Sequence, residues 1–378
     1  MDPLSKELNF KEAVNYHYGD FPPSNIDYAA LIKPISSASA ALARYDQMLR
    51  NMHNSEFLLA PLRVQEAVIS SRIEGTISTL DEVLRYEADQ EEDHDDRRYY
   101  RNEAIEVFLY QRAMQRAQKA VEDGAPLTNW LVRSAHSVLL NFGRGANMSP
   151  GEFKTEQNYL VDKGKRKVLF IPISPEQLKS GVENLFHFID NEEWEVLTKT
   201  ALAHIEFEAL HPFKDGNGRI GRMLIPLLLW KYGVISAPHF YISEFFENNK
   251  DEYIDRMREA SKSGQWTEWC IFFVNALETQ ANENLEVTER IRSLYDEMKE
   301  VFREKLASKW SIDALDFVFS NPVFRNSRFT NRSNIPPQVA SRMSRILVEN
   351  ELLRTIDPPS GRRPALYAFE PLLEIVRR

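Results

Sequence analysis

The sequence contains a single cysteine, Cys270, among its 378 residues. One thiol can form no internal disulfide and cannot supply a cysteine-built zinc site, so the composition favours a reducing compartment. The chain also has no excess of positive charge, because its formal net charge is −9. That balance argues against a protein that coats nucleic acid or a membrane surface with its whole face, although a local basic patch is compatible with it.

Long apolar runs and a signal-peptide pattern are missing as well. The run MLIPLLLW, residues 223–230, is far shorter than the roughly 18 residues that a membrane-spanning helix needs. The first ten residues, MDPLSKELNF, show no basic stretch followed by an apolar one. With 43% apolar residues the chain can bury a substantial core. We expect a soluble cytoplasmic protein of two or three domains with no membrane partner.

Helical patterns dominate what is present. Apolar residues recur at i, i+3 and i+4, opposite charged faces, in segments 37–49, 57–75, 101–124 and 276–306. Gly75 and Gly124 are typical of helix ends. The charged run EEDHDDRR, residues 91–98, is interpreted as a solvated junction between helices, and we place a domain boundary there.

One segment indicates strands instead. Between Thr155 and Pro172, the apolar stretches NYLV and KVLFIP flank a polar DKGKRK tip, which predicts a β-hairpin that could form an exposed flap. The fold class is therefore predicted to be mainly α, with a small hairpin.

The twelve residues HPFKDGNGRIGR, 211–222, are poor material for a packed core and suggest chemistry. Gly216, Gly218 and Gly221 spell GxGxxG, but a dinucleotide site needs a preceding strand, and residues 195–210 predict a helix. We therefore keep dinucleotide binding only as a minor alternative.

A zinc site is a second alternative. His204, Glu208 and His211 are spaced to share a helix face, but no HExxH motif accompanies them. Pro212 ends or kinks the helix directly after His211, so His211 is expected to point away from that face. His204 is then expected to be a packed helix histidine.

A phosphate site explains the motif best. Backbone amides in a turn of Gly216, Asn217 and Gly218 can form an anion-binding nest, and the helix that follows adds its positive N-terminal end. Arg219 and Arg222 lie three apart and supply forked donors for further phosphate oxygens. A plain glycine turn with solvated arginines would explain each residue singly, but not their joint occurrence.

Two residues of the same motif suit a reaction. Asp215 offers a hard oxygen ligand that could share a Mg²⁺ ion with a polyphosphate. His211 is the group that can accept a proton near neutral pH.

The motif matches the signature of the Fic (filamentation induced by cAMP) domain family, HPFx(D/E)GNGRxxR, at every defined position. The likeness covers roughly residues 100–280. It implies a compact helical domain with one β-hairpin flap, and transfer of AMP from ATP to a hydroxyl of a protein side chain.

The resemblance also implies residue roles. His211 would deprotonate the target hydroxyl and Asp215 would hold Mg²⁺. Tyr253 matches an aromatic position beside the adenine, although a tyrosine packed on its own helix is the alternative. The ATP-binding residues that the resemblance implies are Asp215, Gly216, Asn217, Gly218, Arg219, Ile220, Gly221, Arg222 and Tyr253.

Two departures from the family pattern fall near the flap. The family often has paired glycines after an Asn-aromatic step, whereas here Asn158 and Tyr159 are followed by leucine and valine. Lys154 stands where arginine is common. The flap aligns the target segment in this family, so these differences bear on target choice rather than on the chemistry.

A second short stretch, SSRIEG at residues 70–75, resembles the inhibitory-helix motif (S/T)xxxE(G/N) of the same family. Ser70, Glu74 and Gly75 occupy its defined places. The resemblance predicts that Glu74, at a helix end, pairs with Arg222 and takes the place of the γ-phosphate.

The last 58 residues, 321–378, hold ten arginines and five acidic residues, so they differ in charge from the rest of the chain. Their pattern of helix, turn, helix and hairpin resembles a winged helix-turn-helix domain. We weigh duplex DNA against protein docking or dimerisation as its partner, because the basic excess is modest. The residues expected to face outward are Gln338, Ser341, Arg342 and Arg345 on the second helix, with Arg362 and Arg363 at the hairpin tip; those expected in the core are Met343, Ile346 and Leu347.

We thus predict an inhibitory helical region at 1–95, a catalytic domain at 96–300 and a winged-helix domain at 301–378. The predicted function is a nucleotidyltransferase, a protein adenylyltransferase that is autoinhibited by Glu74 and modifies a Ser, Thr or Tyr hydroxyl of an unknown protein, itself included. The alternatives are a DNA-binding regulator that senses nucleotide, removal of AMP, and transfer of another phosphate-containing group. The oligomeric state is left open, a homo-oligomer included.

Overall fold

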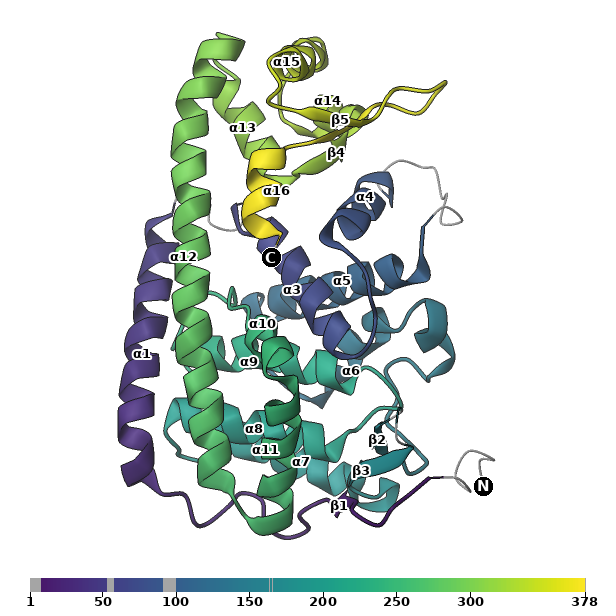
Figure 1. The fold of residues 1–378 in the computed structure, drawn as a ribbon, viewed down its shortest axis with the longest axis vertical. Helices are drawn as coiled ribbons and strands as arrows, with labels where there is room; N and C mark the ends of the chain where they lie inside the picture. The colour runs from purple at the N-terminus through teal and green to yellow at the C-terminus, as the bar shows by residue number, and fades with distance from the viewer. Residues whose placement is uncertain (1–7, 53–57, 91–99, 163, 165, 378) are drawn as a thin grey trace. The chain divides into compact units, whose positions relative to one another are not determined.

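The computed structural model describes residues 8–52, 58–90 and 100–377, apart from positions 163 and 165. The charged run at 91–98, which we interpreted as a junction, lies outside the described residues. Most of the described chain is helical and two small sheets accompany the helices (Figure 1), which confirms the mainly α fold class. Across these residues, no helix combines the length and the apolar character needed to cross a membrane.

The chain forms two compact units, and each is built from two separate segments. The first unit comprises residues 1–43 and 112–281, and the second comprises residues 44–111 and 282–378. The division into segments 1–95, 96–300 and 301–378 stays a prediction about functional parts. Three helices contribute residues to both units: α1 (Tyr28–Asn51), α5 (Asn102–Glu122) and α12 (Trp266–Leu306).

A central buried helix, α8 (Val196–Leu210), organises the first unit. Residues 197–210 are all buried, as expected of a helix that is apolar on most sides. Helix α7 (Pro175–Asn191) and helix α9 (Asn217–Lys231) pack against it (Figure 1). The other helical elements of this unit are α6 (Asn129–Leu139), the 3₁₀ helix Gly143–Asn147, α10 (Ser243–Asn248) and α11 (Lys250–Ser263).

The predicted hairpin is confirmed, and it gains a third strand. Strands β2 (Leu160–Asp162) and β3 (Lys167–Ile171) pair antiparallel, and β1 (Val14–Asn15) adds to β3 in parallel. The chain after β1 is held by one buried carboxylate, because Glu206 of α8 accepts hydrogen bonds from the Tyr16 hydroxyl (2.7 Å) and the His17 ring (2.8 Å). We did not predict β1, since two residues carry too little pattern to indicate a strand.

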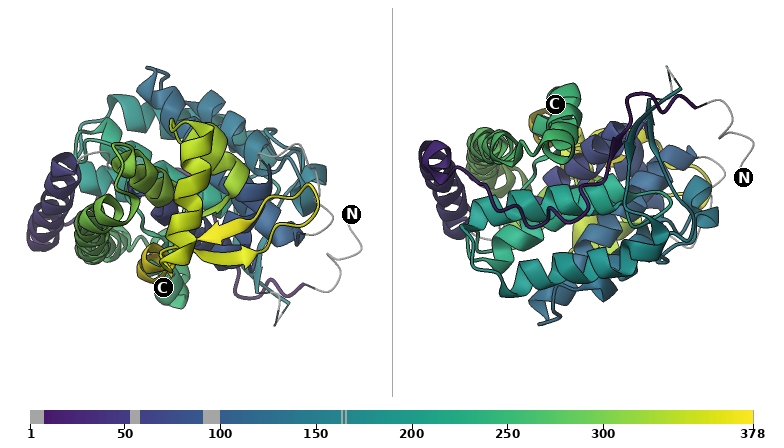
Figure 2. Two further views of the ribbon diagram at one scale, coloured as in Figure 1. Left: turned by 90° about the horizontal axis from the view of Figure 1, so that it is seen from above. Right: turned by 90° about the horizontal axis from the view of Figure 1, so that it is seen from below.

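The second unit confirms the predicted C-terminal pattern of helix, turn, helix and hairpin. Its three strands run antiparallel in the order β4-β6-β5, and β5 and β6 lie side by side in yellow (Figure 2). The elements are α3 (Ala60–Ile73), α4 (Leu80–Gln90), α13 (Ser311–Ser320), β4 (Val323–Arg325), α14 (Asn326–Arg332), α15 (Pro337–Glu349), β5 (Arg354–Asp357), β6 (Leu366–Ala368) and α16 (Glu370–Val376).

The buried and exposed sides of helix α15 agree with the prediction from its sequence. Met343 and Leu347 are buried and Ile346 is half-buried, whereas the predicted outward residues are exposed: Gln338, Ser341, Arg342 and Arg345.

The single cysteine is a core residue of the first unit. Cys270 is fully buried on α12 beside Trp269, and it forms no disulfide. Burial raises the pKa of the Cys270 thiol far above its ordinary value, so the thiol stays protonated and unreactive.

Candidate active site

The motif at 211–222 occupies the reversal between α8 and α9. His211 caps the end of α8 with φ 44° and ψ 61°, and Gly216 caps the start of α9 with φ 79°. Both residues are therefore left-handed. Glycine adopts this conformation at no steric cost, but for histidine it costs about 1 kcal/mol or more. The surrounding contacts must hold His211 in place.

Two asparagine side chains bind the loop backbone. Asn217 is almost fully buried, accepts a hydrogen bond from the Phe213 amide and donates one to the Phe213 carbonyl, both at 2.8 Å. Asn158 donates to the carbonyls of His211 (3.1 Å) and Phe213 (3.0 Å). Asn217, whose backbone amide is predicted to be part of an anion-binding nest, thus also cross-links the loop through its side chain.

His136 of α6 supports the loop from another direction, and sequence reasoning missed it. Its ring stacks on Phe213 with centroids 3.7 Å apart. Nδ1 accepts a hydrogen bond from the Gly151 amide (2.8 Å), so we assign the ring proton to Nε2, which donates to the Asp215 carbonyl (2.9 Å). Burial lowers the pKa of His136 to about 4, which keeps the ring neutral. A lone histidine in a helix gives no sequence signal for this role.

Lys154 completes the support. Its Nζ donates to the Leu210 carbonyl at the end of α8 (3.1 Å) and to the Asn158 side chain (2.7 Å), and its backbone amide donates to the Pro212 carbonyl (2.8 Å). Burial lowers the pKa of the Lys154 amine to about 7. A neutral amine still has two protons to donate, so both bonds survive deprotonation.

The start of α9 concentrates positive charge. Its N-cap, Gly216, has no side chain to cap the first amides, so the helix end offers backbone N–H groups and the positive end of its dipole. Arg219 and Arg222 are 3% and 2% exposed on the same helix. Burial is the main cause of the lowered pKa of His204, and the positive charge of Arg222 lowers that pKa further. This end of the helix is suited to bind an anion with several oxygens.

Asp215 has the chemistry of a Mg²⁺ ligand. Its carboxylate is 46% exposed, and one oxygen accepts the Gly216 amide (2.7 Å) and lies 3.8 Å from Arg219 Nη2. Within the described ranges, no group of three or more His, Cys, Asp or Glu side chains could hold a metal. A single half-exposed carboxylate is compatible with Mg²⁺, which usually keeps several waters and is bound through one or two carboxylates plus phosphate oxygens, so a Mg²⁺ site at Asp215 stays a prediction.

The tautomer of His211 follows from one contact of its ring. Its Nδ1 lies 3.3 Å from the Glu208 carbonyl, which can only accept a hydrogen bond, so we assign the proton to Nδ1. The lone pair then lies on Nε2, the nitrogen that can take a proton from a hydroxyl.

His204 is a packed helix histidine, as predicted. It is fully buried, its Nδ1 lies 3.1 Å from the Gly221 carbonyl, and its Nε2 lies 2.7 Å from the Tyr253 hydroxyl. Burial lowers its pKa to about 3. Since His204 is committed to these partners and His211 leaves the helix in a left-handed turn, the zinc alternative receives no support. A helix, α8, also precedes the motif, which removes the strand that a dinucleotide site requires.

Three predicted ATP-binding residues have packing roles. Tyr253 is 3% exposed and stacks on Phe246 with centroids 4.4 Å apart. Ile220 is fully buried in the core. A Cβ added to Gly221 would lie 2.1 Å from Glu208 Oε1, so a side chain at this position would require the Glu208 carboxylate to move. Their contribution to nucleotide binding stays a prediction.

The SSRIEG segment ends α3 in the second unit. The amides of Gly75 and Thr76 donate to the carbonyls of Arg72 (2.9 Å) and Ser71 (3.0 Å), and Gly75 has φ 87°. This is a Schellman motif, in which a left-handed glycine stops the helix. Glu74 is the capping residue, as predicted, and Ser70 is buried with its hydroxyl 3.4 Å from that of Tyr110. The predicted site residues thus belong to both units: 70–75 to the second, and 211–222 with Tyr253 to the first.

Two family models match the chain. The model described as "Fic/DOC family N-terminal" matches residues 32–119, and the model described as "Fic/DOC family" matches residues 126–229. The second match includes the motif at 211–222, and the first includes SSRIEG.

Individual relatives agree with these models. A probable protein adenylyltransferase of Aquifex aeolicus (strain VF5) is 28% identical over 209 residues, which cover 55% of this chain and 58% of the relative. A uridine 5′-monophosphate transferase of Xanthomonas campestris pv. campestris (strain 8004) is 26% identical over 150 residues, 34% of this chain and 26% of the relative. The chain thus spans less than two thirds of the length of these curated relatives.

A solved structure shows the fold. The crystal structure of a Fic family protein from Desulfovibrio desulfuricans G20 superposes with a TM-score of 0.59 at 20% identity, over 92% of this chain and 98% of that chain.

Lys154 should give the folding stability a pH dependence of known sign. The unfolded amine, with an ordinary pKa of 10.5, stays protonated between pH 7 and 9, whereas the folded amine releases its proton above about 7. The unfolded state then binds more protons, so this group increases stability with pH by up to about 1.4 kcal/mol per pH unit. Urea unfolding at pH 7, 8 and 9 should show a shallower rise for Lys154→Met than for wild type. Lys179→Met, at an exposed position of α7, should keep the wild-type slope, and an equal slope in all three proteins would contradict the prediction.

Gly151 should be intolerant of a side chain. Its φ is 80°, and an added Cβ would lie 3.2 Å from the Arg133 carbonyl oxygen, whereas Gly124 has φ 91° and open space around it. We expect Gly151→Ala to cost about 2 kcal/mol or more, and Gly124→Ala about 1 kcal/mol, in urea unfolding. Equal losses would show that the close approach at Gly151 contributes nothing.

Proposed function

Because the chain belongs to the Fic family, we propose that it is a protein adenylyltransferase. In this proposal it transfers AMP from ATP to a Ser, Thr or Tyr hydroxyl of a protein, its own chain included, in the cytoplasm. The observation that carries the proposal is the left-handed turn at His211, which presents a base directly before the cationic start of α9. The relative named a probable protein adenylyltransferase supports it.

The residues divide the reaction between them. His211 Nε2 takes the proton of the target hydroxyl, and the hydroxyl oxygen forms a bond to the α-phosphorus as the bond to pyrophosphate breaks. Arg219, Arg222 and the first amides of α9 bind the phosphate oxygens. A Mg²⁺ ion, which Asp215 would hold, would neutralise phosphate charge. Positioning and charge neutralisation then supply most of the catalysis.

We also propose that Glu74 inhibits the enzyme. A carboxylate that binds Arg222 would compete with the γ-phosphate for the same guanidinium. The Schellman motif supports this role, because it makes Glu74 the capping residue of α3 and turns the chain away at Gly75.

Other transferred groups are the main alternative. The relative named a uridine 5′-monophosphate transferase shows that a similar chain is associated with a different nucleotide. Removal of AMP from a modified protein would use the same phosphate site.

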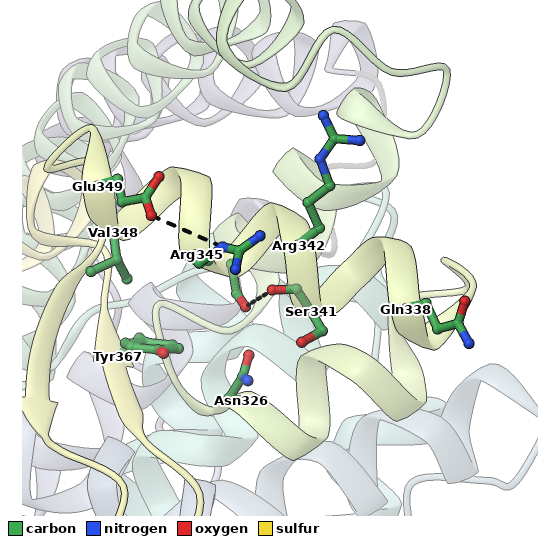
Figure 3. Close-up of a pocket in the computed structure, with 9 residues that line it drawn as sticks. Asn326, Gln338, Ser341, Arg342, Arg345, Val348, Glu349 and Tyr367 are labelled. Carbon is green, nitrogen blue, oxygen red and sulfur yellow. Dashed lines mark hydrogen bonds and ion pairs between the residues drawn. The ribbon is translucent and has the colours of Figure 1, made fainter.

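A groove on the C-terminal module favours DNA binding as a second function. The exposed face of α15 lines an open groove of about 450 Å³, to which α14 contributes Asn326 and β6 contributes Tyr367 (Figure 3). The groove presents amide, hydroxyl and guanidinium groups, the types that contact base edges and phosphates. We propose that the module is a winged helix whose α15 enters the major groove of duplex DNA. At the hairpin tip only part of the predicted contact fits, because Arg363 binds Asp89 at 2.7 Å while Arg362 is exposed.

AMP transfer is tested with the full-length chain and ATP labelled at the α-phosphate. Wild type should label itself weakly, and if a Glu74–Arg222 pair favours the obstructed state by about 2.7 kcal/mol, Glu74→Gly should increase labelling by up to about 100-fold. Glu74→Asp should release activity only in part. His211→Ala should abolish labelling while ATP still binds. The same substitution should also abolish labelling in the Glu74→Gly protein.

The donor separates the alternatives. Label retained from α-labelled ATP but not from γ-labelled ATP identifies AMP transfer, and stronger labelling from α-labelled UTP would replace AMP by UMP. If folded Glu74→Gly is no more active than wild type, the inhibitory role of Glu74 is wrong.

DNA binding is tested by titrating the full-length chain with fluorescent duplex. The affinity should fall steeply with salt, and Arg342→Ala should weaken binding by about fivefold or more. Arg303→Ala, which removes the same charge from an exposed position of α12, should have little effect. If no duplex binds at low salt, protein docking or dimerisation becomes the proposed role of the module.

A further inference from the structure

Helix α4 is joined to the inhibitory glutamate by a short segment. Helix α3 ends at Ile73 and α4 begins at Leu80, so only residues 74–79 lie between them. The position of α4 therefore restricts the positions that Glu74 can take.

An arginine from the C-terminal module holds the first turn of α4. Arg377 donates to both oxygens of Asp81, from Nε at 3.0 Å and from Nη2 at 2.5 Å. Its remaining nitrogen donates to Glu370 at 2.7 Å. Helix α16, which directly precedes Arg377, also packs against α3. This forked pairing has the fixed geometry that a lysine could not provide.

Two further arginines hold the last turn of α4. Asp89 accepts hydrogen bonds from Arg325 Nε (2.6 Å) and Arg363 Nη2 (2.7 Å), and the Tyr100 hydroxyl also donates to it. The side chain of Arg325 is 1% exposed, so the pair is shielded from solvent and salt. Burial alone would raise the pKa of Asp89, but the hydrogen bonds from Arg325 and Tyr100 outweigh it and hold that pKa below its usual value.

Packing between the two elements adds to these ion pairs. Strand β4, which carries Arg325, packs along α4. Both ends of α4 and one of its faces are therefore fastened to residues that lie more than 230 positions later in the chain.

We infer that these three arginines, which we call the arginine clamp, are part of the inhibitory device. The clamp (Arg325, Arg363 and Arg377) fixes α4 within the second unit, and α4 fixes the 74–79 segment, so the C-terminal module sets the orientation of Glu74. Loosening the module releases the glutamate and activates the enzyme. The inference rests on the proposed inhibition by Glu74.

The experiment uses the full-length chain with Arg363→Gln, Arg377→Gln and the double variant. Arg363 and Arg377 are 47% and 33% exposed, so these changes should leave the protein folded. Self-labelling with AMP should increase by about three- to tenfold, which is less than in Glu74→Gly, because the glutamate is displaced only part of the time. Arg303→Gln, which breaks an exposed ion pair on α12, is the matched control and should match wild type.

Combination with Glu74→Gly identifies the route. If the clamp acts through the glutamate, the clamp variants should change labelling by less than about 1.5-fold in the Glu74→Gly background. An equal increase in both backgrounds, or folded clamp variants with wild-type labelling, would overturn the inference.

Hydrogen exchange gives a readout that does not need activity. Amides of residues 74–79 should exchange about threefold faster or more in the double variant than in wild type or Arg303→Gln. Unchanged exchange overturns the clamp even if labelling increases. If Glu74→Gly itself transfers no label, the proposed function fails, and the exchange rates still decide whether the clamp holds the segment.

Discussion

The candidate site depends on one reversal of the backbone, the left-handed turn at His211. A histidine in this conformation is less stable than in a helix, so the turn persists only because other groups bind it. Those groups come from three places in the sequence: His136 on α6, Lys154 and Asn158 before the flap, and Asn217 on α9. Each of these side chains makes at least one hydrogen bond to a backbone atom of the reversal, so the path of the loop is fixed by contacts on both sides of the motif.

Residues of the motif that suit phosphate binding also hold the structure of the loop. Asn217 and Gly221 look like phosphate ligands when the motif is considered alone, yet the side chain of Asn217 cross-links the loop and Gly221 allows α9 to approach Glu208. His211, the proposed base, and the N-terminus of α9 are held a few residues apart by these structural contacts. A reaction that depends on positioning requires such rigidity.

Local patterns explain which parts of the molecule could be predicted. The helices at 37–49 and 101–124, the hairpin and the glycine stop at Gly75 follow from periodicity and turn chemistry within a few residues. Strand β1 and the role of His136 could not be predicted, because each depends on a contact with a segment far away in the sequence. The second unit is also built from two segments that lie far apart in the sequence, so local patterns could not predict it either.

Charge composition alone also does not identify which arginines are available to a partner. The arginines of residues 321–378 suggested a surface for phosphates, but Arg325, Arg354, Arg363 and Arg377 bind carboxylates of their own unit. A count of charges does not show which of them are already neutralised by a partner. The charged groups that face solvent on α15 remain accessible to a binding partner.

The single buried thiol can report how often the core of the first unit opens. Cys270 lies inside the aromatic core of the first unit, where a water-soluble disulfide reagent cannot reach it and where its proton is held tightly. The rate at which such a reagent consumes the thiol then measures how often that core opens, without any introduced label. A nucleotide that makes such openings rarer would lower the rate at which the reagent consumes the thiol.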